Sequence, residues 1–296
     1  HGELTFPLFI PVTTFGKKYP LDDLIRPYLP RLAQAVLVSH HYAKQMKPDE
    51  RPSIPVLVDS GGFASLFENS RLVERDGLGV LKITGETWTE EIDPASVLDF
   101  QEEVADIAFT LDFPIPPHME NDRKEADRRQ ALTVHNALWA LENRRRQTMP
   151  LYASIQAWDE ESARRGARQL AGKGFDGFAL GGMVPRLSNF KKVLSIVRAV
   201  REEVGDAPLH VFGIGKPELI KVLFKLGVDS VDSSSYVKFA AQGKLWGNDN
   251  QVLLDPSPMD RLHLALSNLA MATGASLPLS AHRPLFTAFA HRASVN

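Results

Sequence analysis

The sequence contains no cysteine. Without cysteine the chain has no disulfide, no thiol nucleophile and no zinc site built on thiolates. This absence is typical of a reducing compartment, so we expect a cytoplasmic protein. Two histidines near the C-terminus, His282 and His291, are isolated from other ligand types and are interpreted as surface residues. We therefore expect no metal and no other cofactor.

Long apolar runs and net charge are also scarce. No apolar run approaches the ~20 residues that a membrane span needs, and no signal peptide is recognisable, so we expect no membrane contact. The net charge of -2 excludes a chain that is basic all over, but it leaves room for a local basic face. No linker, low-complexity tract or repeat divides residues 1–296, which we expect to form one domain.

Short apolar runs alternate with segments of helical spacing along most of the chain. This order, at 296 residues, predicts an α/β fold and specifically a (β/α)8 TIM barrel, with an open doubly wound sheet as the alternative. Alternating residues 72–91, around Asp76 and Gly77, predict a β-hairpin insertion after the third strand. The expected strands are 8–12, 35–38, 54–58, 107–111, 151–155, 177–180, 209–212 and 228–231; the expected helices are 21–35, 94–104, 122–147, 160–171, 189–204, 217–226 and 258–272.

Polar residues and glycines collect where these strands end. In a parallel barrel all such ends lie on one face, where active sites are built. Asp59 and Asp232 can therefore face each other across one pocket. For Asp59 alone, a capping carboxylate in a strand-to-loop turn is an equally good interpretation. The residues at the strand ends are Asp59, Asp112, Gln156, Gly181, Gly182, Gly213, Gly215 and Asp232.

A pair of carboxylates suits chemistry at the anomeric carbon of a sugar. One carboxylate attacks the carbon, and the other moves a proton on the leaving group. Asp112 and Gln156 have the acceptors and the amide to read the edge of a flat heterocycle, and Gly181 and Gly182 leave backbone amides accessible to the same ring.

Six segments carry a resemblance to a known family. In order and at compatible spacing, the chain resembles the tRNA-guanine transglycosylase superfamily from about residue 8 to about residue 247. The family's barrel agrees with the strand count. The segments are DSGGF (59–63), DIAFTLD (106–112), the strand ending at Gln156, FDGFALGG (175–182), FGIGKPE (212–218) and GVDSVD (227–232).

The resemblance assigns roles to particular residues. It implies that Asp232 is the nucleophile at C1′ of the target nucleoside and that Asp59 is the general acid/base. It implies that Asp112, Gln156 and Gly182 hold a guanine or 7-deazaguanine base, and we place Ser60, Phe63 and Gly181 in the same base site. Phe63 would stack on the base or, equally, occupy a core or lid position. His40, His41 and Tyr42 line the pocket or are structural.

The chain departs from the family pattern in two ways. Family members that act on tRNA usually carry a Cys3His zinc subdomain, whereas these 296 residues hold no cysteine. After Asp232 the usual Arg-containing stretch is replaced by SSSYVKFAAQGKLW (233–246). These departures resemble the branch that inserts a 7-deazaguanine such as preQ0 into DNA. We therefore expect DNA as the partner in preference to tRNA, and leave open a homodimer or a partner protein.

Two basic segments are candidates for nucleic-acid contact. Lys238, Lys244 and Trp246 follow the nucleophile and could meet phosphates and a stacked base. A second group lies on the predicted helix 122–147, although acidic residues dilute it and a solvated face is the alternative. The group comprises Arg123, Lys124, Arg128, Arg129, Arg144, Arg145 and Arg146.

The predicted reaction is base exchange in two displacements with retention of configuration. A duplex target would have to flip its nucleotide out of the stack or present it single-stranded. Three alternatives remain open: a tRNA-guanine transglycosylase, an enzyme acting on a small nucleoside or sugar phosphate, and a non-catalytic barrel that only binds a base. The last has no use for both Asp59 and Asp232.

Overall fold

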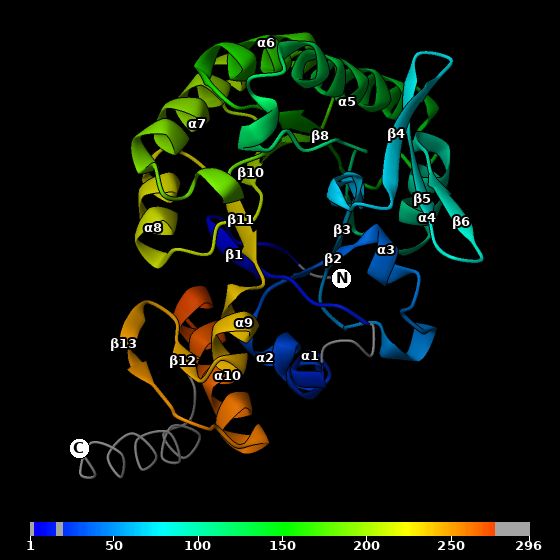
Figure 1. Cartoon of the computed structure of the whole chain (residues 1–296). Helices are drawn as coiled ribbons and strands as arrows, with labels where there is room; N and C mark the ends of the chain where they lie inside the picture. The colour runs from blue at the N-terminus through cyan, green and yellow to red at the C-terminus, as the bar shows by residue number, and fades with distance from the viewer. Residues whose placement is uncertain (1–2, 16–19, 276–296) are drawn as a thin grey trace.

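The computed structural model describes residues 3–15 and 20–275, and a parallel barrel lies at its centre (Figure 1). Its strands follow the order β1-β11-β10-β9-β8-β7-β3-β2, and a parallel bridge between Val12 and Leu37 joins the two ends. The predicted (β/α)8 barrel is therefore confirmed. The barrel strands are β1 (Leu8–Pro11), β2 (Val36–Ser39), β3 (Val56–Asp59), β7 (Ile107–Phe109), β8 (Leu151–Gln156), β9 (Gly177–Gly181), β10 (Leu209–Val211) and β11 (Ser230–Ser233).

Helices cover the outside of the barrel. Figure 1 shows α5 to α8 in an arc around the strands, with α1, α2, α9 and α10 gathered on another side. Several helices begin at a side-chain cap; the Asp93 carboxylate, for example, accepts the Ser96 N–H at 2.8 Å. The helices are α1 (Pro20–Ile25), α2 (Leu29–Leu32), α3 (His40–Ala43), α4 (Pro94–Val104), α5 (Arg123–Asn143), α6 (Glu160–Leu170), α7 (Phe190–Val204), α8 (Pro217–Lys225), α9 (Ser235–Ala241) and α10 (Pro258–Thr273).

The first predicted helix is broken. Residues 21–35 were expected to be one helix, but the structure has α1, a 3-10 turn over Arg26–Tyr28 and then α2. Pro27 and Pro30 fall inside the expected span, and a proline removes an N–H that a continuous helix would bond. The helical spacing of the apolar residues survives, because Ile25, Leu29 and Leu32 are all buried.

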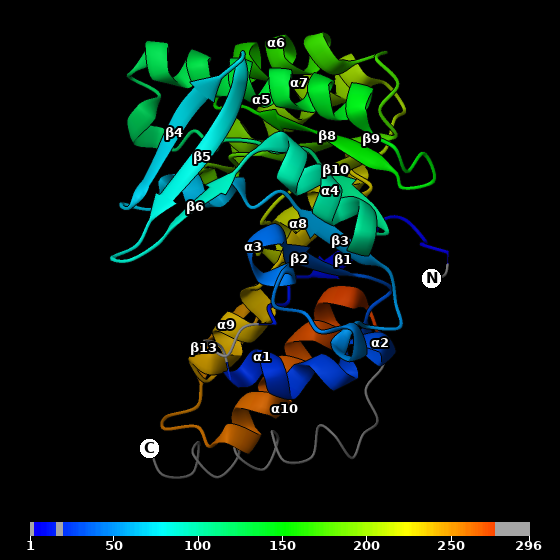
Figure 2. The same cartoon turned by 90° about the vertical axis from the view of Figure 1, so that its right-hand side faces the viewer.

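The insertion after β3 has three strands and not the two of a hairpin. β4 (Ser70–Arg75), β5 (Leu78–Thr84) and β6 (Thr89–Ile92) form an antiparallel sheet, which Figure 2 shows on one flank of the barrel. Asp76 and Gly77 make the first turn as predicted, both with positive φ (52° and 79°). The insertion is fixed to the body of the protein, since Leu81, Ile83 and Ile92 are buried in one cluster with Phe113.

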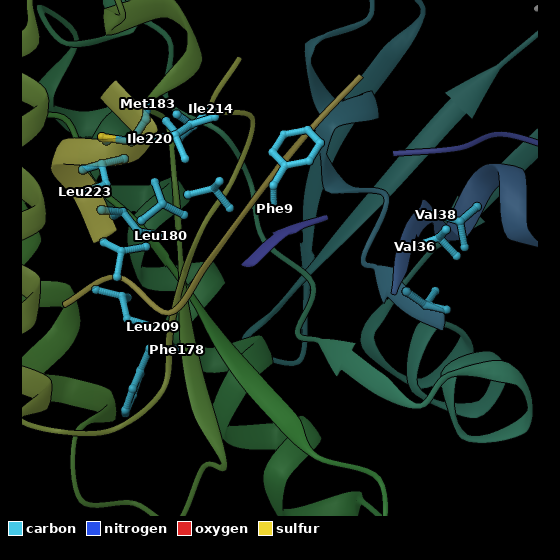
Figure 3. Close-up of a cluster of buried hydrophobic side chains, with 14 of the residues drawn as sticks. Phe9, Val36, Val38, Phe178, Leu180, Met183, Leu209, Ile214, Ile220 and Leu223 are labelled. Carbon is cyan, nitrogen blue, oxygen red and sulfur yellow. The ribbon is translucent and has the colours of Figure 1, made fainter. Parts of the chain in front are cut away.

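Alternation along each barrel strand separates two cores. Residues two apart share a face, so one set of side chains fills the lumen and the other meets the helices. Figure 3 shows part of the outer set, where Phe178, Leu180 and Leu209 lie in one row with Ile220 and Leu223 of α8. The inner set includes Leu8, Ile10, Leu37, Leu57, Phe109, Tyr152 and Ala179.

A short hairpin follows α9, where no strand was expected. β12 (Lys244–Leu245) and β13 (Asn248–Val252) pair antiparallel and lead into α10. Among residues 3–15 and 20–275, no helix is both long enough and apolar enough to cross a membrane.

Candidate active site

The two acids singled out in the sequence occupy the lumen side of the barrel. Asp59 lies two residues after the inward-facing Leu57, at the end of β3. Asp232 lies on β11, where its neighbour Val231 belongs to the outer core. The alternation of a strand therefore points both carboxylates toward the same interior, although 173 positions separate them in the chain. The charge of Asp232 is close enough to raise the pKa of Asp59.

Asp112 and Gln156 form one hydrogen-bonded unit beside these acids. The Gln156 amide donates to Oδ2 of Asp112, and the Ser60 hydroxyl donates to Oδ1 at 2.7 Å. All three side chains are buried. Oε1 of Gln156 accepts no hydrogen bond from the described part of the chain. The unit thus presents a carboxylate, an amide and one unsatisfied acceptor, which is a donor and acceptor set that can read a purine edge.

The protonation of Asp59 is set by its surroundings. Burial and, to a smaller extent, the negative charges of Asp112 and Asp232 together raise its pKa from 3.8 to about 7. The backbone N–H groups of Ser60 and Gly61 oppose this shift; that of Ser60 donates at 2.7 Å. A carboxyl group with this pKa can both give and accept a proton near neutral pH, as acid/base catalysis requires.

Two glycines allow the loops of the site to meet. A Cβ on Gly62 would lie 1.7 Å from the backbone oxygen of Asp112, so only glycine lets the β3 and β7 loops approach this closely. A Cβ on Gly181 would lie 2.1 Å from Nε2 of Gln156, so the glutamine amide lies directly over that backbone. The structure therefore brings Ser60, Asp112, Gln156 and Gly181 together, as the sequence predicted.

The position of Asp232 is fixed by two donors. Its Oδ1 lies 3.0 Å from Nε2 of His210 and accepts the Gly213 N–H at 2.9 Å. Sequence reasoning noted Gly213 but missed His210. The sequence did offer a signal for His210. It lies between Leu209 and Val211, which face outward, so its side chain must face the lumen on the strand before that of Asp232.

Phe63 follows Gly62 in the loop after β3 and does not lie in the core. Its side chain is 61% exposed, and its ring packs edge-to-face on Phe67 with centroids 6.2 Å apart. Phe67 is also exposed, at 48%. The core position left open by the sequence is therefore wrong, whereas stacking on a base stays a prediction.

Comparison with known proteins identifies the family of the chain. The family model described as queuine tRNA-ribosyltransferase matches residues 1–271. The chain belongs to this family. The resemblance to the tRNA-guanine transglycosylase superfamily, a group of pentosyltransferases, is thereby confirmed.

The curated relatives differ in how much they share with the chain. A queuine tRNA-ribosyltransferase of Helicobacter pylori (strain G27) is 27% identical over 276 residues, which are 87% of this chain and 73% of that protein. A tRNA-guanine(15) transglycosylase of Methanococcus aeolicus is 24% identical over 216 residues, 71% of this chain. The aligned part is only 32% of the Methanococcus protein. A Haloferax volcanii tRNA-guanine(15) transglycosylase is 32% identical to this chain, and the aligned part is 30% of that protein. The chain therefore spans about a third of these archaeal relatives.

The three candidate nucleic-acid residues that follow Asp232 have different surroundings in the structure. Lys238 is exposed on α9, and Lys244 is half-buried on β12. Trp246 is only 1% exposed; its indole N–H donates to the Gly215 carbonyl at 2.6 Å, and its ring packs on Phe9. The prediction that Trp246 stacks on a base is wrong, because its ring is buried against Phe9 of β1 and its indole N–H is held by the Gly215 carbonyl.

Most arginines of the segment predicted as helix 122–147, of which α5 covers only Arg123–Asn143, bind other groups of the protein itself. Arg129 is buried and donates to Ser65 and to the Pro114 carbonyl. Arg145 pairs with Asp99 and Glu102. Arg128, Arg144 and Arg146 likewise donate to protein carboxylates or carbonyls, whereas Arg123 and Lys124 remain exposed. The structure thus favours the solvated and structural interpretation for this segment.

The histidines do not form a metal site in the described part of the chain. In residues 3–15 and 20–275 no group of three or more His, Asp or Glu is arranged to hold a metal ion, and His282 and His291 lie outside these ranges. His40 is buried against Phe100 and the Gly61 turn, and burial lowers its pKa to about 4. A structural role fits it better than a place in the pocket.

A buried arginine, also missed in the sequence, ties the base-site loops together. Arg186 is 3% exposed and donates to the carbonyls of Gly182 and Ile115 and to the Glu120 carboxylate. Because the Gly182 carbonyl is held in this way, the orientation of the neighbouring peptide groups is fixed. Gly182 itself adopts φ of 83°, which side chains disfavour.

Proposed function

We propose that the protein exchanges guanine in a nucleic acid, DNA in preference to tRNA, for a 7-deazaguanine such as preQ0. The observation that carries this proposal is the convergence of Asp59 and Asp232 on one interior, beside the Asp112 and Gln156 unit. The family membership supports the reaction class, since the curated relatives are named as guanine transglycosylases and queuine tRNA-ribosyltransferases.

In the first displacement Asp232 attacks C1′ of the target nucleotide. A bond forms between a carboxylate oxygen and C1′, and the C1′–N9 bond breaks with its electron pair moving to the guanine. Protonated Asp59 supplies the proton that the departing base takes up, which its pKa of about 7 allows. A covalent glycosyl-enzyme remains, and no redox step is involved.

The second displacement reverses these events with a new base. The incoming 7-deazaguanine lies against Asp112 and Gln156, beneath the exposed ring of Phe63. Asp59, now ionised, accepts the N9 proton. N9 then attacks C1′, and the bond to Asp232 breaks. Because each displacement inverts C1′, the configuration is retained overall.

The segment after Asp232 is our reason for proposing DNA as the substrate in preference to tRNA. In place of an arginine-containing stretch, α9 presents the short sequence SYVKFAA with the single exposed Lys238. A tRNA substrate is the second candidate, and the printed names of the relatives favour it. In either case the target base must leave its stack, because a barrel mouth cannot accept a paired base.

The test is base exchange with labelled guanine and labelled preQ0. Double-stranded DNA, single-stranded DNA and bulk tRNA are offered side by side to the wild type and to Asp232→Ala. We expect label in DNA, single strands reacting faster, and none with Asp232→Ala. Label only in tRNA would overturn the preference for DNA. No label in any polymer, with exchange on a free nucleoside, would move the assignment to a small substrate.

A further inference from the structure

His210 is inserted between two residues of the neighbouring strand. β10 and β11 run parallel with His210 opposite Ser230, and Asp232 follows two residues later on the same face. Nδ1 of the ring lies 2.8 Å from the Ser230 hydroxyl, and Nε2 lies 3.0 Å from Oδ1 of Asp232. The ring is fully buried and is packed by Phe109 and Phe212, with centroids 5.1 and 4.8 Å away. It therefore has no room to turn away.

These contacts determine which nitrogen carries the proton. An ionised carboxylate only accepts hydrogen bonds, so Nε2 must be the donor to Asp232. The Ser230 hydroxyl can rotate to donate, and it then satisfies Nδ1 as an acceptor. A histidine that carries a proton on Nε2 completes this chain of hydrogen bonds from Ser230 to Asp232.

The two oxygens of Asp232 are not equivalent. Oδ1 accepts from His210 and from the Gly213 N–H. Gly213 adopts φ of 74°, and a Cβ there would lie 2.2 Å from Val184, so the turn that aims this N–H requires glycine. Oδ2 accepts no hydrogen bond from residues 3–15 or 20–275. One oxygen is thus anchored and the other is left for bond formation.

We propose that His210 is a positioning residue that holds Oδ1 of Asp232, so that Oδ2 attacks C1′ and the carboxylate leaves readily in the second displacement. This inference rests on the proposed function of Asp232. When the glycosyl-enzyme forms, the new bond joins Oδ2 to C1′, and Oδ1 becomes the ester carbonyl. When N9 of the incoming base attacks, the electron pair of the C1′–Oδ2 bond returns to Asp232, and the proton of N9 passes to Asp59.

Hydrogen bonds to Oδ1 act differently on the two steps. They are stronger to a carboxylate than to an ester carbonyl, since bonds to ionised groups are roughly twice as strong. They therefore favour departure of the carboxylate and restrain its attack. Removing the donor should slow the second displacement by about 10- to 100-fold and leave the first within about threefold, so that glycosyl-enzyme accumulates.

The kinetic experiment compares His210→Leu with His210→Gln. Glutamine places an N–H donor near the position of Nε2, whereas leucine fills the space without one. We expect covalent enzyme–nucleic acid adduct on denaturing gels to build up with His210→Leu and to return toward the wild-type level with His210→Gln. Ser230→Ala should show the same trend more weakly. Exchange at the wild-type rate by folded His210→Leu, or equal losses in both variants, would overturn the proposal.

A second measurement tests the positioning without any substrate. Nitrogen-15 NMR of the histidine ring should show the proton on Nε2 in the wild type and a changed ring signal in Asp232→Asn. A proton on Nδ1 with bare Nε2 would overturn the proposal, because the ring could not then donate to Asp232. If the wild type exchanges no base on any polymer, the proposed function fails, while the ring signals still decide whether His210 holds Oδ1.

Discussion

At the scale of single residues, the pKa of Asp59 makes this side chain a source of instability. The folded protein raises that pKa from 3.8 to about 7, so it binds the proton more tightly than the unfolded chain does. The unfolding free energy therefore falls as the pH rises from about 4 to about 7 and stays low above that range. This loss of unfolding free energy is present at neutral pH, where Asp59 would act as acid and base.

Asp59→Asn should stabilise the protein at high pH. Asparagine has the same shape, keeps an oxygen for the Ser60 N–H and carries no charge. We expect the unfolding free energy to increase by about 1–3 kcal/mol at pH 8 and to change little at pH 4. Urea denaturation at both pH values measures this. An equal change at the two values would contradict the assignment of the raised pKa to Asp59.

The same group should shape the pH dependence of exchange. When the incoming base is scarce, the second displacement limits the rate and needs ionised Asp59. Its rate should then rise with pH and level off above about 7. Initial rates of label entry from pH 5.5 to 8.5 test this. A flat profile, with Asp59→Asn as active as the wild type, would exclude Asp59 as the base.

Residues of the site were predictable from the sequence where they directly follow a recognisable strand. Asp59, Asp112 and Gln156 stood out because each follows an apolar strand. His210 did not, since a lone histidine inside a strand is usually a core residue, and its partner Asp232 lies on the next strand. Trp246 was misassigned because a tryptophan beside lysines looks the same in sequence whether its ring faces solvent or, as here, Phe9.

At the scale of elements, the loops after β3 and β7 are joined through the space above Gly62. Gly62→Ala would bring a Cβ to 1.7 Å from the Asp112 backbone oxygen, so one loop must shift. We expect KM for the base to rise more than tenfold and the unfolding free energy to fall by about 1–3 kcal/mol. Gly77→Ala is the matched control: it has open space but positive φ, and should lose about 1 kcal/mol with unchanged KM. An unchanged KM in Gly62→Ala would show that the loop spacing is not needed for base binding.

Trp246 should matter for stability and not for nucleic-acid contact. Its ring is buried and holds the Gly215 carbonyl, so Trp246→Ala should cost about 3–5 kcal/mol. Thermal or urea unfolding measures this, with the exposed Lys238→Ala expected to stay within about 0.5 kcal/mol of the wild type. A stable Trp246→Ala protein with weakened nucleic-acid binding would restore the stacking interpretation.

Elements were predictable where periodicity was uninterrupted. The helix over 94–104 has an Asp cap, a proline at its first position and regular spacing, and α4 matches it. The helix over 21–35 had the spacing but also Pro27 and Pro30, and the prolines decided the outcome. No helix or strand was predicted between Asp232 and residue 257, because α9 and the β12–β13 hairpin are too short for a periodic signal.

At the scale of the whole molecule, nucleic-acid binding should depend on salt through a few lysines. Lys238 lies on α9, which follows the strand that carries Asp232, and is exposed. If it contacts a phosphate, Lys238→Ala should reduce the slope of log K against log salt by about 0.9. Fluorescence anisotropy with a short DNA from 50 to 300 mM salt measures this. Lys173→Ala, exposed after the C-terminal end of α6, should leave the slope unchanged. Equal slopes for Lys238→Ala and the wild type would remove Lys238 from the interface.

The barrel itself was predictable because its signal is repeated. Each strand and helix adds weak evidence, and eight such units in order outweigh an error in any one of them, including the broken first helix. The sequence carries no such repeated signal for the identity of the substrate. It depends on a few residues around the mouth, and their contacts arise only when distant strands meet.

Neighbouring strands of the barrel are not paired equally, because in the described part of the chain only the bridge between Val12 and Leu37 pairs β1 with β2. The seam between β1 and β2 is held by this pair and by the Thr13 N–H, which donates to the Leu37 carbonyl at 2.9 Å, whereas β8 and β9 match over five residue pairs. Under native conditions deuterium should therefore enter the Thr13 amide well before those of β8 and β9. β1 also pairs with β11, opposite Asp232. Opening of the seam would thus widen the barrel beside Asp232 while β8 and β9 stay paired.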